Sequence, residues 1–342
     1  MTQTHFVIVA LQTFFCPWSE FSLPAPYTCE FRDYASTRPD QVAERIRDAD
    51  IVIATLSPFT AEILNPEMTP RLKMISVIAS GTDNVDLAAC RARGIVVGNA
   101  PHCNEATVTE HALALYFATR RSLTLTHSLV RSGNWPSQQQ HRIMDGARGA
   151  PPMTMRDELV GIIGYGSVGR TIEKRARLLG MKCVIAARKG KDAGTGMGIL
   201  PPPPPVGRAS FDTVIRECSV LMICLPRAPE TMNLLSGAEF EVMKRHVVVI
   251  NVSRGGIVDE KAVVRALTDG RIAGYGTDVF AQEPAEPETS VLLAPDTRDL
   301  NLVMTPHVAW YGEETLNNYR RTCKENIVEF LMRGRAKYEV VG

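Results

Sequence analysis

The sequence lacks the features that mark membrane, secreted and nucleic-acid-binding proteins. No apolar run approaches the roughly 20 residues that span a bilayer, and the opening MTQTHFVIVALQ has no basic segment before its short apolar run. We expect this opening to form a β-strand and not a signal peptide. The 38 Lys and Arg residues almost balance the 37 Asp and Glu residues, which gives no indication of a nucleic-acid or membrane partner. A cytoplasmic protein is therefore expected.

The spacing of the cysteines argues against a C-x-x-C motif and against a zinc site. The eight cysteines form no C-x-x-C pair and show no ligand spacing typical of zinc, so no metal is expected. Several lie inside apolar runs, among them Cys183 and Cys224. This distribution indicates buried, reduced thiols, which are typical of cytoplasmic proteins.

Short apolar runs alternate with helix-like stretches, over a length that is too great for one ordinary core. Strand-like runs lie at 5–11, 49–56, 72–79, 95–99, 159–166, 182–187, 220–225, 247–253, 272–280 and 301–306. Apolar residues recur at helical spacing in the stretches 39–49, 105–133, 167–180 and 312–334. The alternation predicts an α/β protein of two domains, with parallel sheets covered by helices.

Two stretches interrupt this alternation. Residues 133–153 show no periodicity and are expected to form an irregular arm. Residues 190–207 are rich in glycine and contain five consecutive prolines, which favour extended polyproline II and forbid helix. We expect a surface loop there and assign it no role.

A glycine motif is the strongest local signal. Gly164, Gly166 and Gly169 form G-x-G-x-x-G between the strand-like LVGII and a helix, and the intervening residues are Tyr165, Ser167 and Val168. The first glycine suits a tight turn, the second suits close approach of a pyrophosphate, and the third suits helix–strand packing. The helix N-terminus also offers N–H groups to phosphates. The motif predicts a dinucleotide site; a purely structural glycine turn is the alternative.

The end of the next strand-like run bears on the choice of cofactor. An NAD site usually has Asp or Glu there to bind the ribose hydroxyls, whereas this chain has Ala187, Arg188 and Lys189. No carboxylate repels a 2′-phosphate, and a guanidinium binds phosphate well. The pattern favours NADPH without excluding NADH. The alternative is that Arg188 and Lys189 are solvated loop charges.

The motifs in combination resemble those of the D-isomer-specific 2-hydroxyacid dehydrogenase family, which includes glyoxylate/hydroxypyruvate reductase and phosphoglycerate dehydrogenase. LVGIIGYGSVG resembles the cofactor fingerprint, VIRECSVLMICLPRAPETMNLLS the second signature and MKRHVVVINVSRGGIVDE the third. DVFAQEP and TPHVAW follow at similar distances, and VIASGTDNVD resembles the segment that holds the substrate carboxylate. The resemblance implies two Rossmann-like domains and NAD(P)H-dependent reduction of a 2-keto acid to a D-2-hydroxy acid.

The resemblance also implies a catalytic trio. Arg254 would bind the carboxylate and carbonyl of the keto acid, for which a planar bidentate donor is suited. His307 would be the general acid in reduction and the base in oxidation, because histidine changes charge near neutral pH. Glu283 would bond the other imidazole nitrogen and favour the charged ring. Each residue alone could have a structural role, but all three follow strand-like runs in the family's order.

Further residues are assigned to binding by the same resemblance. The backbone N–H groups of Ser80 and Gly81 would receive the substrate carboxylate, while Leu56 and Trp310 would line the substrate pocket. The residues expected along the cofactor cleft are Thr107, Leu225, Pro226, Val252 and Asp278. The chain departs from the family where Cys224 replaces a common histidine, a position outside the catalytic trio.

The implied organisation inserts one domain into the other. Residues 1–102 and 309–342 are expected to form the substrate domain. Residues 103–308 are expected to form the dinucleotide-binding domain, with a dimerisation helix and an arm. Crossings near Pro101 and Pro306 would act as hinges whose closure excludes water. A homodimer is expected.

Two other functions are compatible with the same fold. A corepressor-like interaction module would recruit partners, but the trio is complete and no basic targeting run is visible. An NAD-linked formate dehydrogenase would need an active-site asparagine, for which Asn104 is a candidate, and an acidic strand end, which is absent. A 2-keto acid reductase is the favoured hypothesis.

Overall fold

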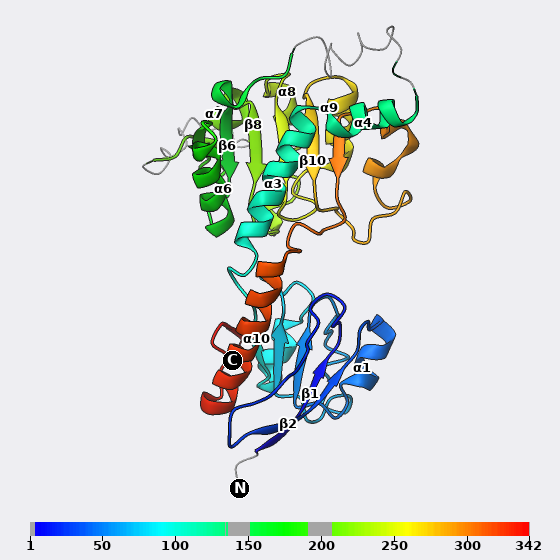
Figure 1. The fold of residues 1–342 in the computed structure, drawn as a ribbon, viewed down its shortest axis with the longest axis vertical. Coiled ribbons are helices and arrows are strands. Elements are labelled where there is room, and N and C mark those ends of the chain that lie inside the picture. Colours follow the sequence, from blue (N-terminus) through cyan, green and yellow to red (C-terminus); the bar gives the residue numbers. More distant parts are fainter. Residues whose placement is uncertain (1–3, 134, 136–150, 191–206, 342) are drawn as a thin grey trace, which may run out of the picture. The chain divides into compact units, whose positions relative to one another are not determined.

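The computed structural model describes residues 4–133, 135, 151–190 and 207–341, and Figure 1 shows its fold. The chain divides into two compact units, residues 1–104 with 311–342 and residues 105–310. The second unit is inserted into the first, and both boundaries lie two residues after the expected ones. The expected arm and the expected proline-rich loop fall almost wholly outside the described residues. Within the described ranges, no helix has the length and apolar character to cross a membrane.

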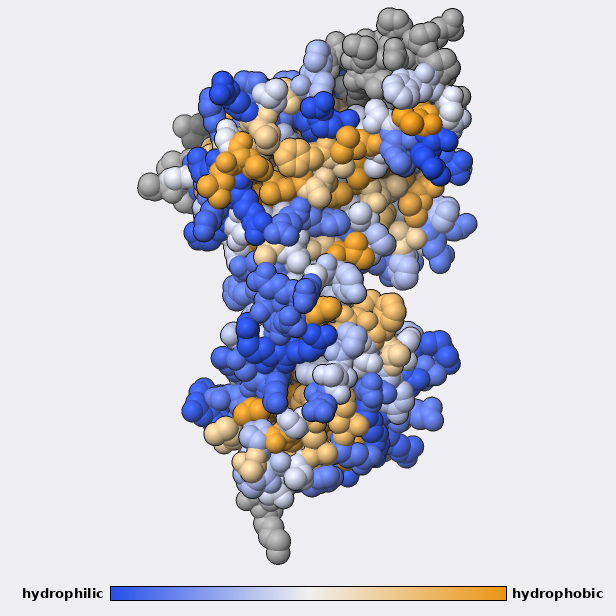
Figure 2. All heavy atoms as spheres, in the orientation of Figure 1, coloured by the Kyte–Doolittle hydropathy of each residue, from blue (hydrophilic) through white to orange (hydrophobic). Residues whose placement is uncertain are grey.

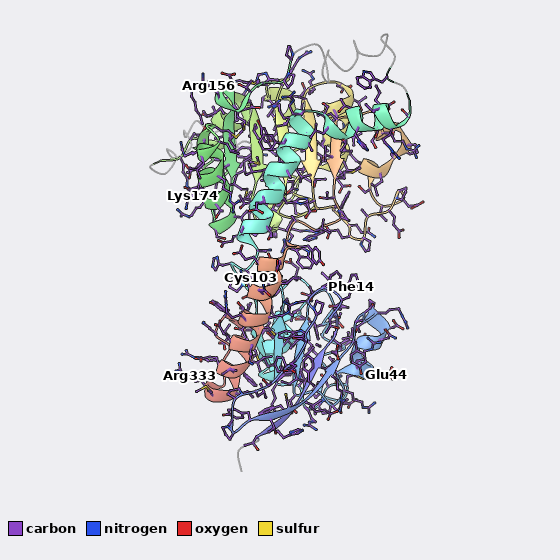
Figure 3. All side chains as sticks on the ribbon, in the orientation of Figure 1. Phe14, Glu44, Cys103, Arg156, Lys174 and Arg333 are labelled. Carbon is purple, nitrogen blue, oxygen red and sulfur yellow. The ribbon has the colours of Figure 1, made fainter. Side chains whose placement is uncertain are left out.

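The first unit contains a six-stranded sheet in the order β12-β5-β4-β3-β1-β2, parallel except for β12. Its strands are β1 (His5–Ala10), β2 (Thr28–Asp33), β3 (Ile51–Ala54), β4 (Met74–Val77), β5 (Val96–Gly98) and β12 (Glu339–Val341). Its α-helices are α1 (Val42–Arg45), α2 (Leu87–Arg93) and α10 (Glu313–Arg333). Cys103, labelled in Figure 3, packs against α10, with its Sγ 3.4 Å from the Thr322 hydroxyl. The edge strands β2 and β12 were not predicted, because they carry exposed residues and no continuous buried run.

The second unit contains a six-stranded, fully parallel sheet in the order β11-β10-β9-β8-β6-β7. Its strands are β6 (Leu159–Ile163), β7 (Lys182–Ile185), β8 (Val220–Ile223), β9 (Val248–Asn251), β10 (Gly274–Thr277) and β11 (Leu302–Met304). One face packs against α3 (Glu105–Arg120) and α6 (Ser167–Leu178); the other packs against α7 (Phe211–Glu217), α8 (Gly237–Val242) and α9 (Glu260–Thr268). The predicted architecture of parallel sheets covered by helices is confirmed. The strand order reverses between β6 and β8, and such sheets bind ligands outside the carboxyl ends of the strands at this point.

Two helices are shorter than predicted. The single helix expected over 105–133 is wrong: α3 and α4 (Leu123–Arg131) are separate, and between them Ser122 has a left-handed φ of 47°. The helix expected over 39–49 is a 3-10 turn, Pro39–Gln41, followed by the four-residue α1. Neither helix ends at a glycine or proline, so the apolar periodicity gave no sign of where it stops.

A buried ion pair ties α3 to the sheet of the second unit. Arg120 donates from Nε to Glu158 Oε1 at 2.6 Å and from Nη2 to Oε2 at 3.1 Å. The guanidinium also donates to the carbonyls of Ser219 and His246, and the Tyr116 hydroxyl donates to Glu158. The Arg120 and Glu158 side chains are only 4% and 0% exposed. Each charge therefore depends on the other for compensation.

Candidate active site

Three neighbouring strands of the second unit end at one edge of its sheet. Since β9, β10 and β11 are adjacent and parallel, the residues that follow them are brought together despite their separation in sequence. Arg254 follows β9, Glu283 follows β10 and His307 follows β11. Backbone bonds tie these ends: the His307 N–H donates to the Asp278 carbonyl at 2.8 Å, and the Asp278 N–H donates to the Asn251 carbonyl at 3.0 Å.

His307 is held in an uncommon conformation beside a carboxylate. Its φ of 54° lies in the left-handed region, which is sparsely populated by residues with a side chain. Its Nδ1 lies 2.6 Å from Glu283 Oε2, and its carbonyl accepts a bond from the Trp310 indole N–H at 2.9 Å. The imidazole is 38% exposed. With Nδ1 engaged, Nε2 is the ring nitrogen that can exchange a proton with a ligand.

Glu283 is a carboxylate at neutral pH. Partial burial raises its pKa, but the bonds that it accepts from His307 and from the Phe280 N–H outweigh this effect and lower the pKa below its ordinary value. The positive charge of Arg254 lowers the pKa further. An ionised carboxylate both orients the imidazole and stabilises its protonated form. The pair can therefore act as a general acid.

Arg254 reaches this cluster because a glycine lets two loops touch. A Cβ on Gly255 would lie 1.7 Å from the Phe280 carbonyl oxygen, so only glycine allows the loop after β9 to pack against the loop after β10. The Asn251 side-chain amide donates to the Arg254 carbonyl at 3.0 Å and fixes the turn. A partly buried guanidinium is thereby placed close enough to Glu283 for its charge to act on it.

Asp278 organises the loop that carries His307, a role that the sequence did not indicate. The carboxylate is 1% exposed. Its Oδ1 accepts bonds from the Thr305 hydroxyl at 2.6 Å and the Val308 N–H at 2.9 Å, and its Oδ2 accepts one from the Ala309 N–H at 2.8 Å. The carboxylate thus holds the Thr305 side chain before His307 and the backbone after it. Its expected contact with the cofactor stays a prediction.

The glycine motif forms a tight turn that leads into α6. Gly164 has a φ of 95°, and a Cβ there would lie 2.5 Å from the Cys224 carbonyl oxygen. A Cβ on Gly169 would lie 2.3 Å from the Gly164 carbonyl oxygen, so this glycine lets α6 approach the strand. A Cβ on Gly166 would meet no described protein atom within 4 Å, which leaves that side of the loop open. Gly166 is also the N-cap of α6 and makes no side-chain cap, so the first N–H groups of the helix can bind an anion.

The other expected cleft residues lie near the same strand ends. Leu225 follows β8, and its Cδ2 would lie 2.9 Å from a Cβ on Gly164, across the point where the strand order reverses. Pro226, next in sequence, is exposed. The Thr107 hydroxyl, on α3, donates to the Trp310 carbonyl at 3.4 Å. The remaining cleft residue, Val252, directly follows β9.

The cysteines form no disulfide with one another. All eight lie within the described residues, and all are free thiols. Burial raises the pKa of the Cys224 thiol to about 12, so the residue that replaces a common histidine is uncharged. In the part of the chain that the structure describes, no group of three or more His, Cys, Asp or Glu residues could hold a metal ion.

The cations after β7 differ in their availability. Ala187 offers no acid, and Arg188 is exposed. Lys189 instead forms an ion pair with Glu239, with Nζ 2.6 Å from Oε1. Its charge is therefore balanced within the protein. This pairing could not be predicted from local sequence, because the two residues are 50 positions apart.

In the first unit, the segment after β4 carries the groups expected to bind a carboxylate. Among the described residues, neither the Ser80 N–H nor the Gly81 N–H has a hydrogen-bond acceptor. The Asn99 side chain donates to the Ser80 carbonyl at 2.8 Å and steadies the segment. Leu56, which follows β3, is 60% exposed. These groups are available to a ligand.

Two side chains, one in each unit, contact segments expected to bind ligands and had no signal in the sequence. Gln12 Oε1 accepts three backbone N–H groups of the loop after β3, those of Thr55, Leu56 and Ser57. Arg208 lies with its guanidinium carbon 5.8 Å from the centre of the Tyr165 ring, within the glycine motif. Both contacts join residues that are far apart in the chain. Periodicity and local spacing do not predict such contacts.

Known proteins are similar to this chain over most of its length. Residues 113–309 match the family model described as D-isomer specific 2-hydroxyacid dehydrogenase, NAD binding domain. Glycerate dehydrogenase of Methylorubrum extorquens is 35% identical over 313 residues, which cover 91% of each chain. Glyoxylate reductase of Korarchaeum cryptofilum is 29% identical over 304 residues, which cover 88% of this chain and 85% of that one. The structure of an NADPH-dependent glyoxylate/hydroxypyruvate reductase of Sinorhizobium meliloti has a TM-score of 0.73 at 25% identity, covering 98% of this chain and 97% of that one.

Proposed function

Because the chain belongs to the D-isomer specific 2-hydroxyacid dehydrogenase family, whose activity is NAD(P)-dependent, we propose that it reduces a 2-keto acid to a D-2-hydroxy acid and prefers NADPH. The observation that carries the proposal is the Glu283–His307 pair, at 2.6 Å, beside Arg254. Relatives named as glycerate dehydrogenase and glyoxylate reductase support a 2-keto acid as the class of substrate.

In the proposed mechanism, each side chain of the site stabilises a charge or transfers a proton. The bound cofactor supplies the hydride. Arg254 binds the substrate carboxylate and carbonyl, and its charge stabilises the negative charge that develops on the carbonyl oxygen. His307 donates a proton from Nε2 to that oxygen, while Glu283 keeps the ring oriented and protonated beforehand. The N–H groups of Ser80 and Gly81 bind the carboxylate.

We propose that Leu56 and Trp310 contact the substituent of the keto acid. Leu56 is 60% exposed and Trp310 is partly buried, and their apolar surfaces favour an apolar substituent over a small polar one. The test is NADPH oxidation with a panel of 2-keto acids from glyoxylate to phenylpyruvate, followed by chiral analysis of the product. An L-product, or no turnover with any member, would refute the proposed function.

Glu283→Gln is expected to lower the pH at which reduction begins to slow. The pKa of Glu283 lies below its ordinary value, so Glu283 keeps a negative charge beside the His307 ring throughout the neutral range. Glutamine keeps the shape and loses the charge, so the ring gives up its proton at a lower pH. Reduction needs the protonated ring, so its rate should begin to fall at a lower pH than in the wild-type enzyme. Oxidation needs the neutral ring, so its rate should begin to rise at a lower pH than in the wild-type enzyme.

The measurement is kcat against pH in both directions. Glu288→Gln removes an exposed carboxylate from the same loop and should leave both profiles in place. Unchanged profiles in Glu283→Gln would count against the pairing.

The choice of cofactor is expected to depend on Arg188. A bond to a charged group is worth roughly 10- to 150-fold in affinity, so Arg188→Ala should raise the KM for NADPH by an amount of this order. The kcat should change little, because the 2′-phosphate lies far from the transferred hydride. Ala187→Asp should favour NADH by adding a ribose acceptor and a repulsive charge. Steady-state kinetics with both cofactors test this; a wild-type enzyme that used NADH equally well would refute the NADPH preference.

We also propose that the second unit forms a homodimer through α3 and α6. Leu113, Ala114 and Phe117 of α3 retain exposed surface, and Leu178 of α6 is 79% exposed. Figure 2 shows hydrophobic side chains gathered over these helices. A contiguous apolar surface of this kind is typical of a protein–protein interface.

A further inference from the structure

A short segment fixes Arg208 at the carboxyl end of β7. The Ala209 N–H donates to the Ile185 carbonyl at 2.9 Å, and the Ala209 carbonyl accepts from the Ala187 N–H at 2.8 Å. These bonds form a parallel bridge outside β7, which is otherwise the edge strand of its sheet. In dinucleotide-binding folds, the adenosine ribose lies at the end of this second strand. Arg208 is therefore held beside the expected ribose site.

The pairing also decides which way Arg208 points. Parallel pairing sets Arg208 opposite Ile185, and because side chains alternate along a strand, both share a face with Ala187. Cys183, on that same face, packs into the core beneath α6. The contact of the Arg208 guanidinium with the Tyr165 ring agrees with this direction. Arg208 thus faces the glycine motif.

The Tyr165 ring holds Arg208 without removing its charge. The Tyr165 hydroxyl donates to Glu173 on α6, which fixes the ring. The guanidinium carbons of Arg170 and Arg208 lie 4.5 Å and 5.8 Å from its centre. An aromatic face attracts a guanidinium through its quadrupole and carries no negative charge of its own. The Tyr165 ring therefore orients Arg208 and places no negative charge beside it.

Lys189 differs from Arg208 in this respect. Its Nζ lies 2.6 Å from Glu239, a carboxylate that is itself 9% exposed. A phosphate placed at Lys189 would also meet that negative charge, which offsets the attraction. Among the described residues, no carboxylate lies within ion-pair distance of Arg188 or Arg208.

We propose that Arg208 and Arg188 together bind the 2′-phosphate of NADPH, and that Lys189 lies outside this site. Arg188 directly follows Ala187, and Arg208 directly precedes Ala209, which pairs with Ala186, so both residues lie at the carboxyl end of β7. Each guanidinium carries a planar pair of N–H donors, which suits a phosphate. This inference rests on the proposed use of NADPH. It adds a specificity-determining residue that follows the proline-rich stretch.

The test measures binding without turnover. Calorimetric titration of the full chain with 2′,5′-ADP and with 5′-ADP compares ligands that differ only in the 2′-phosphate. Arg208→Met should weaken binding of 2′,5′-ADP by roughly 10- to 150-fold and change binding of 5′-ADP little. Arg208→Lys, which keeps the charge and loses the planar fork, should give a smaller loss. Unchanged 5′-ADP binding also shows that the variant is folded.

Two further variants sharpen the result. Arg216→Met removes an exposed charge of α7, and Lys189→Met removes the paired cation; neither should change the ratio of the two affinities appreciably. Arg208→Met with wild-type affinity for 2′,5′-ADP, or a loss confined to Lys189→Met, would overturn the inference. A wild-type chain that binds 5′-ADP as tightly as 2′,5′-ADP would refute the NADPH preference itself, which separates the two failures.

Discussion

His307→Ala is expected to lower kcat for keto-acid reduction by about 10²–10⁴-fold and to leave the Kd of NADPH nearly unchanged. The imidazole is fixed through Nδ1, 2.6 Å from Glu283, and Nε2 is left to protonate the substrate oxygen. Without that proton, the charge that develops on the oxygen is stabilised by Arg254 alone. The glycine motif follows β6 and makes no bond to His307, so cofactor binding should persist.

The measurement is steady-state reduction together with NADPH titration of the same preparation. Added imidazole should restore part of the lost kcat, which a merely structural role for the ring would not allow. His5→Ala, at the amino end of β1, serves as the matched control and should keep wild-type kinetics. A kcat near the wild-type value would remove His307 from the mechanism, and a parallel loss of NADPH binding would indicate a structural role instead.

The parts of the site that the sequence predicted are those that depend on parallel-sheet geometry. Arg254, Glu283 and His307 each follow a buried apolar run, and parallel strands bring their carboxyl ends to one edge. The three glycines could likewise be found from a strand–turn–helix context, and in the structure a Cβ would meet backbone at Gly164 and Gly169 and no described atom at Gly166. Local pattern and chain direction were sufficient in both cases.

What the sequence did not predict depends on contacts between distant residues. The Lys189–Glu239 pair and the bonds that Asp278 makes around His307 both depend on side chains that only the folded sheet brings together. The break between α3 and α4 depends on the left-handed backbone of Ser122, and no glycine at this position indicates it in the sequence. The edge strand β2 was missed because its residues are partly or fully exposed. It therefore lacks the continuous apolar run by which the central strands are recognised.

The buried pair in the second unit gives the largest expected effect on stability. Glu158→Gln should lower the free energy of unfolding of that unit by about 3–5 kcal/mol, because Arg120 would remain desolvated without a compensating charge. Glutamine fills the same space, so the loss would reflect charge and not a cavity. The carbonyls of Ser219 and His246 still accept bonds from the guanidinium but carry no net charge to balance it.

Urea unfolding followed by circular dichroism measures this loss, and an exposed ion pair between α3 and α6 supplies the control. Glu110 of α3 lies 2.7 Å from Arg175 of α6, but the two side chains are 61% and 35% exposed, so Glu110→Gln should cost no more than about 1 kcal/mol. Arg120→Met combined with Glu158→Leu should recover part of the loss, since an apolar pair leaves no unpaired charge behind. If Glu158→Gln cost no more than Glu110→Gln, the pair would not contribute to stability through its charge. Recovery in the double variant would separate that contribution from the loss of the Tyr116 bond to Glu158, which both Glu158 substitutions disturb.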